Sequence, residues 1–380
     1  MIELPFFDDS HRALHRRLQE VSSRLDPVNA RGERGDVDGA AREAIRLCVE
    51  LGLCRLLVPR SLGGEGDLRS LCIVREALAA ASGLADAVFA VQGLGSYPIA
   101  LSRNRAMAER YLPAVTDGTA VAAFAITEPE AGSDAGAVAT RATRDADDYV
   151  LDGTKVFISN ATIASFFIVF ARTAEGPTRA ISAFVVDANT PGVTIARRQE
   201  MSAPHPIGEL RFEQCRVPAA NRLGEEGDGM RLALGTLDFF RTSVGAAACG
   251  LAARALSESV ARARARKQFG AAISTFQLTQ AALADMATEL AAARLLVYRA
   301  AWTKDAGADR VTAEAAMAKL FATEAAQRIV DRAVQIHGGL GVERGTVVER
   351  LYREVRALRI YEGTSEIQRL VIGRSVTADS

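Results

Sequence analysis

The spacing of apolar residues predicts helices in the first third of the chain. Between residues 37 and 53, apolar side chains return every three or four positions, which places them on one face of a helix. Residues 70–81 and 106–115 show the same spacing. Residues 63–67 are rich in glycine, but no Lys-Ser or Lys-Thr follows, so we interpret them as a plain loop and not as a phosphate loop. We therefore expect a helical region up to residue 120.

At about residue 121 the period of the apolar pattern changes. Residues 121–127 form a strand-like run, and the runs 149–151 and 154–159 flank the turn dipeptide Asp152-Gly153, which predicts a hairpin. Further strand-like runs follow at residues 166–170, 180–186, 193–195 and 209–212. No helical pattern separates these runs, so they favour an antiparallel barrel or sandwich over a Rossmann sheet.

After Gly227-Asp228-Gly229 the helical spacing returns and persists. It covers four stretches, at residues 230–269, 276–304, 312–337 and 347–358. Four helices with short links indicate an up-down bundle. The predicted fold class is an α+β multidomain protein, with an N-terminal α-helical domain (1–120), a middle antiparallel β-barrel domain (121–228) and a C-terminal four-helix bundle domain (229–380).

Composition narrows the function classes. Lys and Arg (46) balance Asp and Glu (46), which argues against a nucleic acid or membrane surface held by bulk charge. There is no apolar run of 18 residues and no basic and apolar leader, so we expect neither a membrane span nor a signal peptide. The five cysteines are scattered without a CxxC motif, which favours a reducing, cytoplasmic location. No cluster has metal-ligand spacing, so we expect no metal.

Two stretches of the β region carry residue types that could hold a flat ligand. Thr127 and Ser133 surround a glycine, so hydroxyl and backbone N–H groups can approach a ligand closely. Phe157 and Ser159 alternate along a strand and share one face, where a ring and a hydroxyl could flank a heterocycle. A polar turn and ordinary strand packing explain these stretches at least as well.

Two helix ends could meet phosphate groups. The basic residues at 262–267 could hold a pyrophosphate, although basic side chains at a helix C-terminus need no special function. The glycine-rich residues 335–341 are a weak phosphate-loop signal, because a helix stops there and does not start.

The stretch Tyr361-Glu362-Gly363-Thr364 interrupts a helical run near the C-terminus. Gly363 can adopt a positive φ and break the helix, so that Glu362 is aimed and not buried. A carboxylate flanked by Ile360 and the ring of Tyr361 could have a raised pKa and act as a base. The stretch is also consistent with a turn between helices that carries a solvated glutamate.

Taken together, five motifs resemble those of the acyl-CoA dehydrogenase family along nearly the whole chain. They stand in the family's order and spacing, and the predicted order of domains is similar too. The motifs are FAITEPEAGSD at 124–134, KVFISN at 155–160, RKQFG at 266–270, QIHGG at 335–339 and YEGTS at 361–365.

The resemblance implies a non-covalent FAD between the β domain and the C-terminal bundle, shared across a subunit boundary of a homotetramer, or at least a dimer. Arg266 would reach the pyrophosphate of the neighbouring subunit's FAD with its planar guanidinium. Phe157 stands where many members have Trp, so it would cover the flavin ring less extensively. The residues implied to bind FAD are Thr127, Ser133, Phe157, Ser159, Arg266, Phe269, Gln277, Gln335, Gly339 and Thr364.

The resemblance also implies that Glu362 is the catalytic base. It would remove the α-proton of an acyl-CoA while the β-hydrogen leaves as hydride to flavin N5, and the product would be a trans-2-enoyl-CoA. Its backbone N–H would help to polarise the thioester carbonyl. A minority branch has its base at the position of Phe240, which cannot be one. The residues implied to bind substrate are Ser133, Asp238, Arg241 and Gly363.

The acyl group stays open at this point. Phe239 and Phe240 could shape the pocket for a short, branched or cyclic acyl group, or pack within the bundle, and residues 201–206 depart from the family's sequence. An electron-transfer flavoprotein is the implied electron acceptor. The alternatives are an acyl-carrier-protein dehydrogenase or an acyl-CoA oxidase on the same fold, or a non-catalytic flavoprotein that serves as a binding module.

Overall fold

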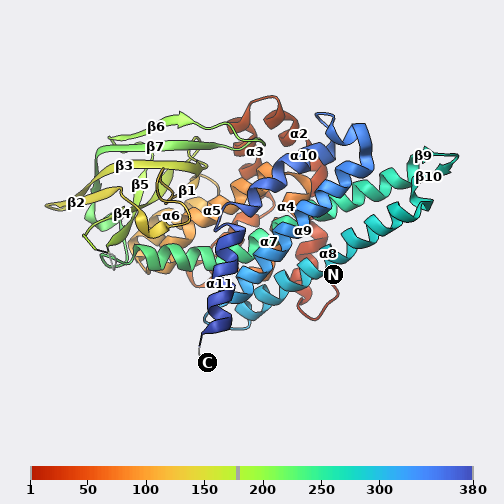
Figure 1. The fold of residues 1–380 in the computed structure, drawn as a ribbon. Helices are drawn as coiled ribbons and strands as arrows, with labels where there is room; N and C mark the ends of the chain where they lie inside the picture. The colour runs from red at the N-terminus through yellow and green to blue at the C-terminus, as the bar shows by residue number, and fades with distance from the viewer. Residues whose placement is uncertain (1, 177–179, 379–380) are drawn as a thin grey trace. The chain divides into compact units, whose positions relative to one another are not determined.

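The computed structural model describes residues 2–176 and 180–378. Its helices, strands and helices follow one another in the predicted order (Figure 1). The helices are α1 (Asp9–Arg17), α2 (Val21–Glu33), α3 (Val37–Glu50), α4 (Leu68–Ala81), α5 (Gly83–Ser102), α6 (Arg105–Thr116), α7 (Gly229–Ala265), α8 (Gln277–Asp305), α9 (Thr312–His337), α10 (Val347–Val355) and α11 (Ser365–Thr377). The strands are β1 (Ala122–Ala125), β2 (Arg141–Asp145), β3 (Asp148–Ser159), β4 (Phe166–Arg172), β5 (Ile181–Asp187), β6 (Val193–Arg198), β7 (Ile207–Pro218), β8 (Arg222–Leu223), β9 (Lys267–Gln268) and β10 (Ala271–Ala272).

The chain forms two compact units, each built from segments that are distant in sequence. The bundle unit contains the chain up to Asp26, Leu68–Asp86, and the chain from Asp238 onwards. The sheet unit contains Pro27–Asp67 and Ala87–Leu237. The three predicted domains, with boundaries after residues 120 and 228, stay a prediction.

In the sheet unit, strands β1–β8 form one mixed sheet. The strand order is β6-β7-β3-β2-β4-β5-β8, and β1 pairs with β4. Most pairs are antiparallel as predicted, but β1 runs parallel to β4, and β2 meets β4 in a parallel bridge. A parallel pair needs a long crossover. The segment between β1 and β4, which contains the hairpin of β2 and β3, supplies it.

Strand β4 is central to this sheet and is buried on both faces. Phe166, Ile168 and Phe170 join one apolar cluster, in which helix α6 also takes part. Phe167 and Val169 join a second cluster on the other face. Because side chains alternate along a strand, a strand covered on both faces reads as a continuous apolar run, and this one does.

The hairpin predicted at Asp152-Gly153 is wrong. Strand β3 continues through both residues, and the pairing of β3 with β7 shifts register between Leu151 and Gly153. The Asp152 carboxylate accepts hydrogen bonds from the backbone N and Nε2 of Gln214 across this bulge. An Asp-Gly pair inside a long strand is thus a bulge here. The turn lies earlier, after Asp145, which pairs with Asp148.

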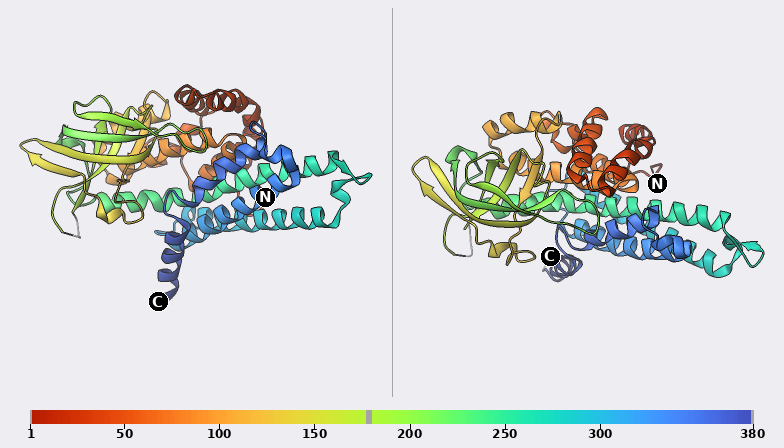
Figure 2. Two further views of the ribbon diagram at one scale, coloured as in Figure 1. Left: turned by 45° about the horizontal axis from the view of Figure 1, so that its top comes forward. Right: turned by 90° about the horizontal axis from the view of Figure 1, so that it is seen from above.

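The bundle unit is organised around the long helices α7 (from Asp238 on), α8 and α9, which run alongside one another (Figure 2). They approach closely at Gly245, where an added Cβ would lie 2.8 Å from Val297 on α8 and 3.2 Å from the backbone oxygen of Ala318 on α9. Helix α7 ends at Ala265, before the predicted residue 269. Strands β9 and β10 follow and form a short hairpin.

Helix α5 is long and apolar enough to cross a membrane by length and composition, with a mean hydropathy of 1.3 in its most apolar window. However, 78% of that window is buried inside the structure. Burial of this extent is typical of a core helix. The five cysteines are free and buried, as expected for a reducing compartment.

Candidate active site

The turn that precedes α11 lies in the bundle unit and has an unusual backbone. A short 3-10 helix ends at Arg359, and α11 begins at Ser365. Between them Glu362 has a φ of 53° and Gly363 a φ of 87°. The predicted break at Gly363 is therefore present, and the left-handed conformation also includes Glu362. A left-handed φ is uncommon for a residue with a side chain, so the surroundings have to hold it.

Hydrogen bonds to the backbone oxygens hold this turn from two sides. Lys319 on α9 donates from Nζ to the oxygen of Gly363 at 2.6 Å. Gln368 on α11 donates from Nε2 to the same oxygen at 2.9 Å and to the oxygen of Glu362 at 3.3 Å. Thr364 caps α11, because its Oγ1 accepts from the backbone N of Ile367 at 3.3 Å. The helix that follows the turn therefore starts at a fixed place.

Glu362 is half-buried among charged side chains. Its Oε2 is buried and makes no hydrogen bond within the described residues. Burial raises the pKa of Glu362 above its usual value, and the nearby charges of Arg75, Lys319 and Arg241 oppose this rise. The result is a carboxylate with a raised pKa and a free oxygen, which suits a general base.

A buried ion pair, Arg75 with Asp86, lies close enough to Glu362 for its charges to act on the carboxylate. Arg75 on α4 donates from Nε and Nη2 to the two oxygens of Asp86 on α5, both at 2.9 Å, and from Nη1 to Ser243 Oγ at 2.9 Å. Arg75 and Asp86 are 1% and 5% exposed, so a bidentate pair compensates both charges. Sequence reasoning missed this pair and Lys319. The available signal was weak: Asp86 is the one charged residue of the apolar helix α5, whereas α4 and α9 each carry several charged residues.

Arg241 and Asp238, both predicted to bind substrate, lie on α7 and contact each other. Arg241 donates from Nη1 to Asp238 Oδ1 at 2.7 Å, and Asp238 Oδ2 accepts from Thr312 Oγ1 at 2.8 Å. Nε of Arg241 is buried without a hydrogen bond within the described residues. Phe240 is fully buried and packs edge-to-face on Phe239, with ring centroids 5.4 Å apart. Phe240 therefore packs within the unit, whereas Phe239 is half-buried.

In the sheet unit a buried ion pair anchors the loop that carries Thr127 and Ser133. Lys155 is 0% exposed and donates from Nζ to Glu128 Oε1 at 2.7 Å and to the backbone oxygens of Ile126 at 3.1 Å and of Phe170 at 2.6 Å. Glu128 also accepts from the backbone N of residues 139 and 140, at 2.6 and 2.9 Å. Ser133 is exposed and Thr127 is half-buried, so the anchor leaves both near the surface of the unit.

Phe157 and Ser159 lie at the end of β3, where a second bulge falls between Lys155 and Ile158. This bulge interrupts the alternation from which a shared face was predicted. Phe157 has a φ of 55° and is 56% exposed. Ser159 Oγ lies 2.7 Å from Nε2 of the half-buried His205. Burial lowers the pKa of His205 to about 4, so the imidazole is neutral near pH 7.

The remaining residues predicted to bind FAD lie in the bundle unit and are exposed. Phe269, in the β9–β10 hairpin, is 97% exposed. Arg266, Gln277, Gln335 and Gly339 are exposed as well. None of them forms a hydrogen bond or an ion pair with Glu362 within the described residues. Exposed side chains of this kind are free to meet a ligand or a second copy of the chain.

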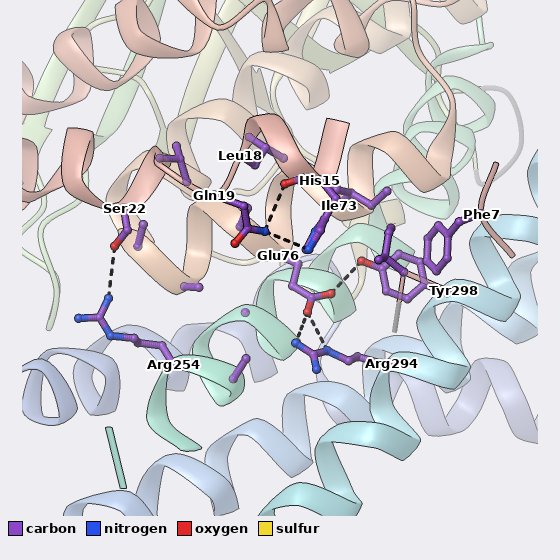
Figure 3. Close-up of a pocket in the computed structure, with 17 residues that line it drawn as sticks. Phe7, His15, Leu18, Gln19, Ser22, Ile73, Glu76, Arg254, Arg294 and Tyr298 are labelled. Atoms are coloured by element: carbon purple, nitrogen blue, oxygen red, sulfur yellow. Dashed lines mark hydrogen bonds and ion pairs between the residues drawn. The ribbon is translucent and has the colours of Figure 1, made fainter. Parts of the chain in front are cut away.

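A pocket of about 480 Å³ in the bundle unit contains none of the predicted site residues (Figure 3). It is lined by residues of α1, α2, α4, α7 and α8. Its buried charge is already paired, because Glu76 accepts from Arg294 Nε at 2.7 Å and from Tyr298 Oη at 2.8 Å (Figure 3). The pocket therefore offers no reacting group comparable with Glu362.

Comparison with known proteins identifies the class. The N-terminal, middle and C-terminal domain models of acyl-CoA dehydrogenases match residues 8–119, 123–215 and 227–377. The chain belongs to the acyl-CoA dehydrogenase family. Members of this family are FAD-dependent oxidoreductases that act on CH–CH groups, so the predicted fold class, enzyme class and cofactor are confirmed.

Individual relatives match over nearly the full length. The cyclohexane-1-carbonyl-CoA dehydrogenase of Geobacter metallireducens is 37% identical, with 95% of this chain and 96% of the relative covered. The caffeyl-CoA reductase-Etf complex subunit CarC of Acetobacterium woodii is 37% identical, with 98% of each covered. The structure of butyryl-CoA dehydrogenase from Megasphaera elsdenii matches with a TM-score of 0.91 and 33% identity, over 98% of this chain and 99% of that one.

The residues present fit FAD. Phe157 and Ser133 are exposed and do not pack in the core, so the ring and the hydroxyl are accessible to a ligand. A Cβ added at Gly132, beside Ser133, would meet nothing within 4 Å, so a ligand can approach the backbone there. In the bundle unit the exposed guanidinium of Arg266 suits a pyrophosphate.

Proposed function

We propose that this chain oxidises an acyl-CoA to the trans-2-enoyl-CoA, with Glu362 as the base that takes the α-proton. The observation that carries the proposal is the buried Oε2 of Glu362, which makes no hydrogen bond within the described residues. A carboxylate left without a donor in a buried place is costly unless a partner arrives. The α C–H of a bound thioester would be that partner.

Several groups of the chain would each have a separate role in this oxidation. Glu362 accepts the α-proton, and its raised pKa brings the base closer to the working pH. The backbone N–H of Glu362 would polarise the thioester carbonyl, and Gly363 would lie beside the thioester. Arg241 and Asp238 would contact the CoA side of the substrate. When bound, FAD supplies the acceptor for the β-hydride.

Thr127, Ser133, Phe157, Ser159 and Thr364 would hold the flavin part of FAD. Arg266, Phe269, Gln277, Gln335 and Gly339 would hold its pyrophosphate and ADP part from a neighbouring copy of the chain. A homotetramer in the cytoplasm, with an electron-transfer flavoprotein as acceptor, belongs to the same proposal. Similarity to a subunit of a caffeyl-CoA reductase-Etf complex supports that acceptor.

That similarity also favours a second candidate, reduction of a 2-enoyl-CoA in the reverse direction. By microscopic reversibility the same residues would serve, with protonated Glu362 donating the α-proton. The direction of net flux then depends on the redox partner and not on Glu362.

The test is anaerobic mixing of the FAD-loaded protein with a panel of straight, branched, cyclic and aryl acyl-CoAs. A substrate should bleach the oxidised flavin band. Glu362→Gln should keep FAD and lose this reduction by roughly 10²–10⁴-fold, the usual contribution of a general base. Glu366→Gln, which changes an exposed carboxylate four residues away, is the matched control and should reduce normally.

Four outcomes would contradict the proposal or change its electron acceptor or acyl carrier. No bleaching with any thioester would refute the dehydrogenase and leave a flavoprotein binding module. An active Glu362→Gln would place the base elsewhere. Rapid hydrogen peroxide formation in air would indicate an oxidase, and bleaching only by carrier-protein thioesters would indicate an acyl-carrier-protein enzyme.

A further inference from the structure

Lys319 is a buried cation that no carboxylate neutralises directly. It lies in the middle of α9 and is 0% exposed. Its ammonium donates to the backbone oxygen of Gly363, and it forms no ion pair with a carboxylate of the described residues. Burying an ammonium is expensive unless other groups compensate for it. A cation kept there in spite of this cost points to a role beyond packing.

The position of Lys319 connects it to the proposed base. The oxygen that it contacts belongs to the residue after Glu362, in the turn where Glu362 has a φ of 53°. Such a backbone costs roughly 1–3 kcal/mol and persists only when the surroundings determine it. Gln368 donates to the same oxygen at 2.9 Å. The carbonyl of Gly363 therefore accepts from one charged donor, Lys319, and one neutral donor, Gln368.

The charged groups that face Glu362 come from four elements. Arg75 on α4, Arg241 on α7 and Lys319 on α9 are positive, and Asp86 on α5 is negative. Arg75 is paired with Asp86 at 2.9 Å, and Arg241 is paired with Asp238 at 2.7 Å. Lys319 is therefore the one of these three cations whose charge is not cancelled by a carboxylate in direct contact, within the described residues.

We propose that Lys319 is a positioning residue for Glu362: its hydrogen bond to Gly363 fixes the turn, and its charge stabilises the ionised carboxylate. This inference rests on the proposed function, in which Glu362 is the base. A nearby cation favours the charged form of a carboxylate, so Lys319 keeps Glu362 ionised in a place where burial favours the neutral acid. Burial lowers the pKa of Lys319 to about 8, and it remains charged below that pH.

Loss of the Lys319 charge should shift the pH profile of proton removal in one direction only. Without the charge of Lys319, burial and Asp86 raise the pKa of Glu362 further, and the base becomes protonated at a higher pH. The acid limb of the pH profile of proton removal must then move towards higher pH. Loss of a neutral donor to the same carbonyl, as in Gln368→Met, leaves the charge in place and does not move this limb.

The experiment compares wild type, Lys319→Met, Lys319→Gln and Gln368→Met as FAD-loaded proteins. The probe is acetoacetyl-CoA, whose α-proton is acidic and whose β-carbon carries no hydrogen. Enolate absorbance then reports proton removal without flavin reduction. We expect the enolate absorbance to appear roughly tenfold more slowly at mildly acidic pH in both Lys319 variants, because fewer of the Glu362 carboxylates are ionised there, and we expect an acid limb at higher pH. Gln368→Met should keep the wild-type limb.

The outcomes separate this inference from the proposed function. Wild-type enolate formation with an unchanged acid limb in the Lys319 variants would overturn the role of Lys319 and leave Glu362 as the base. Enolate formation that persists in Glu362→Gln would overturn both. Methionine is close to lysine in size and apolar, so the folded state tolerates it in a buried site. Lys319→Gln provides the same readout if Lys319→Met does not fold.

Discussion

Replacement of Lys155 by methionine tests how the predicted FAD loop is held. Lys155 is fully buried and donates three hydrogen bonds, at 2.7 Å to Glu128 Oε1 and at 3.1 and 2.6 Å to two backbone oxygens. In Lys155→Met, Glu128 keeps two backbone N–H donors but loses its counter-charge. Removal of one partner of a buried ion pair costs about 3–5 kcal/mol. Because two donors remain, we expect a loss of about 3 kcal/mol.

The same change has a predictable pH dependence. In the wild type, burial raises the pKa of Glu128, but Lys155 and the backbone N–H groups outweigh burial and leave this pKa below its usual value. Stability from Glu128 is therefore present above its unfolded pKa and is lost as pH falls through its folded pKa. In the variant the pKa of Glu128 is raised, because burial is no longer opposed by Lys155. The free-energy cost of burying the charged carboxylate then falls as the carboxyl takes up a proton. The difference in unfolding free energy should be largest near pH 7 and smaller near pH 4.

The assay is urea unfolding of wild type, Lys155→Met, Glu128→Gln and the double variant, followed by circular dichroism at both pH values. A coupling energy of about 2 kcal/mol or more between the two sites is expected for groups in direct contact. The loop that carries Thr127 and Ser133 should also loosen, so flavin fluorescence should reveal weaker FAD retention. A loss below about 1 kcal/mol at pH 7, or an equal loss in the Glu128→Gln background, would refute this account.

Two further predictions concern the half-buried imidazole of His205 and a helix contact. Burial holds the pKa of His205 at about 4 against an ordinary 6.5, so the stability that it contributes is present above pH 6.5 and is lost as pH falls through 4. This loss is at most about 3 kcal/mol. In His205→Gln the urea concentration at the unfolding midpoint should depend less on pH between 6.5 and 4. Gly250→Ala places a Cβ 2.1 Å from the backbone oxygen of Glu76, and should cost about 1–3 kcal/mol in thermal unfolding. Gly373→Ala, whose Cβ meets nothing within 4 Å, should instead stabilise its helix slightly.

Sequence patterns located elements whose periodicity is uninterrupted. Helix α9 spans Thr312–His337, as predicted, because apolar and small residues recur through it without glycine or proline. Helix α5 (Gly83–Ser102) was not predicted as a separate element. Gly93, Gly95 and Pro98 break its pattern, and the buried surroundings compensate for their low helix propensity.

Charged residues in the interior were the part of the site that the sequence did not reveal. Arg75 is fully buried, yet an arginine in a helix that also carries Arg69 and Glu76 reads as a surface residue. Its partner Asp86 lies eleven residues away on another helix, so no local spacing connects the two. Lys319 likewise lies 44 residues from the carbonyl that it contacts. Pairings of this range depend on the fold and cannot be read from periodicity.

Backbone strain gives support for the site that is independent of motif resemblance. Seven described residues other than glycine have a positive φ, and Phe157, Phe269 and Glu362 are three of them. All three were predicted to contact FAD or substrate, and none belongs to a residue type that readily adopts this conformation. Strained residues persist where the surroundings determine them, and they concentrate at functional sites. At Glu362 the donors Lys319 and Gln368 hold the strained turn, so the conformation that aims the carboxylate and the charge that ionises it come from the same contacts.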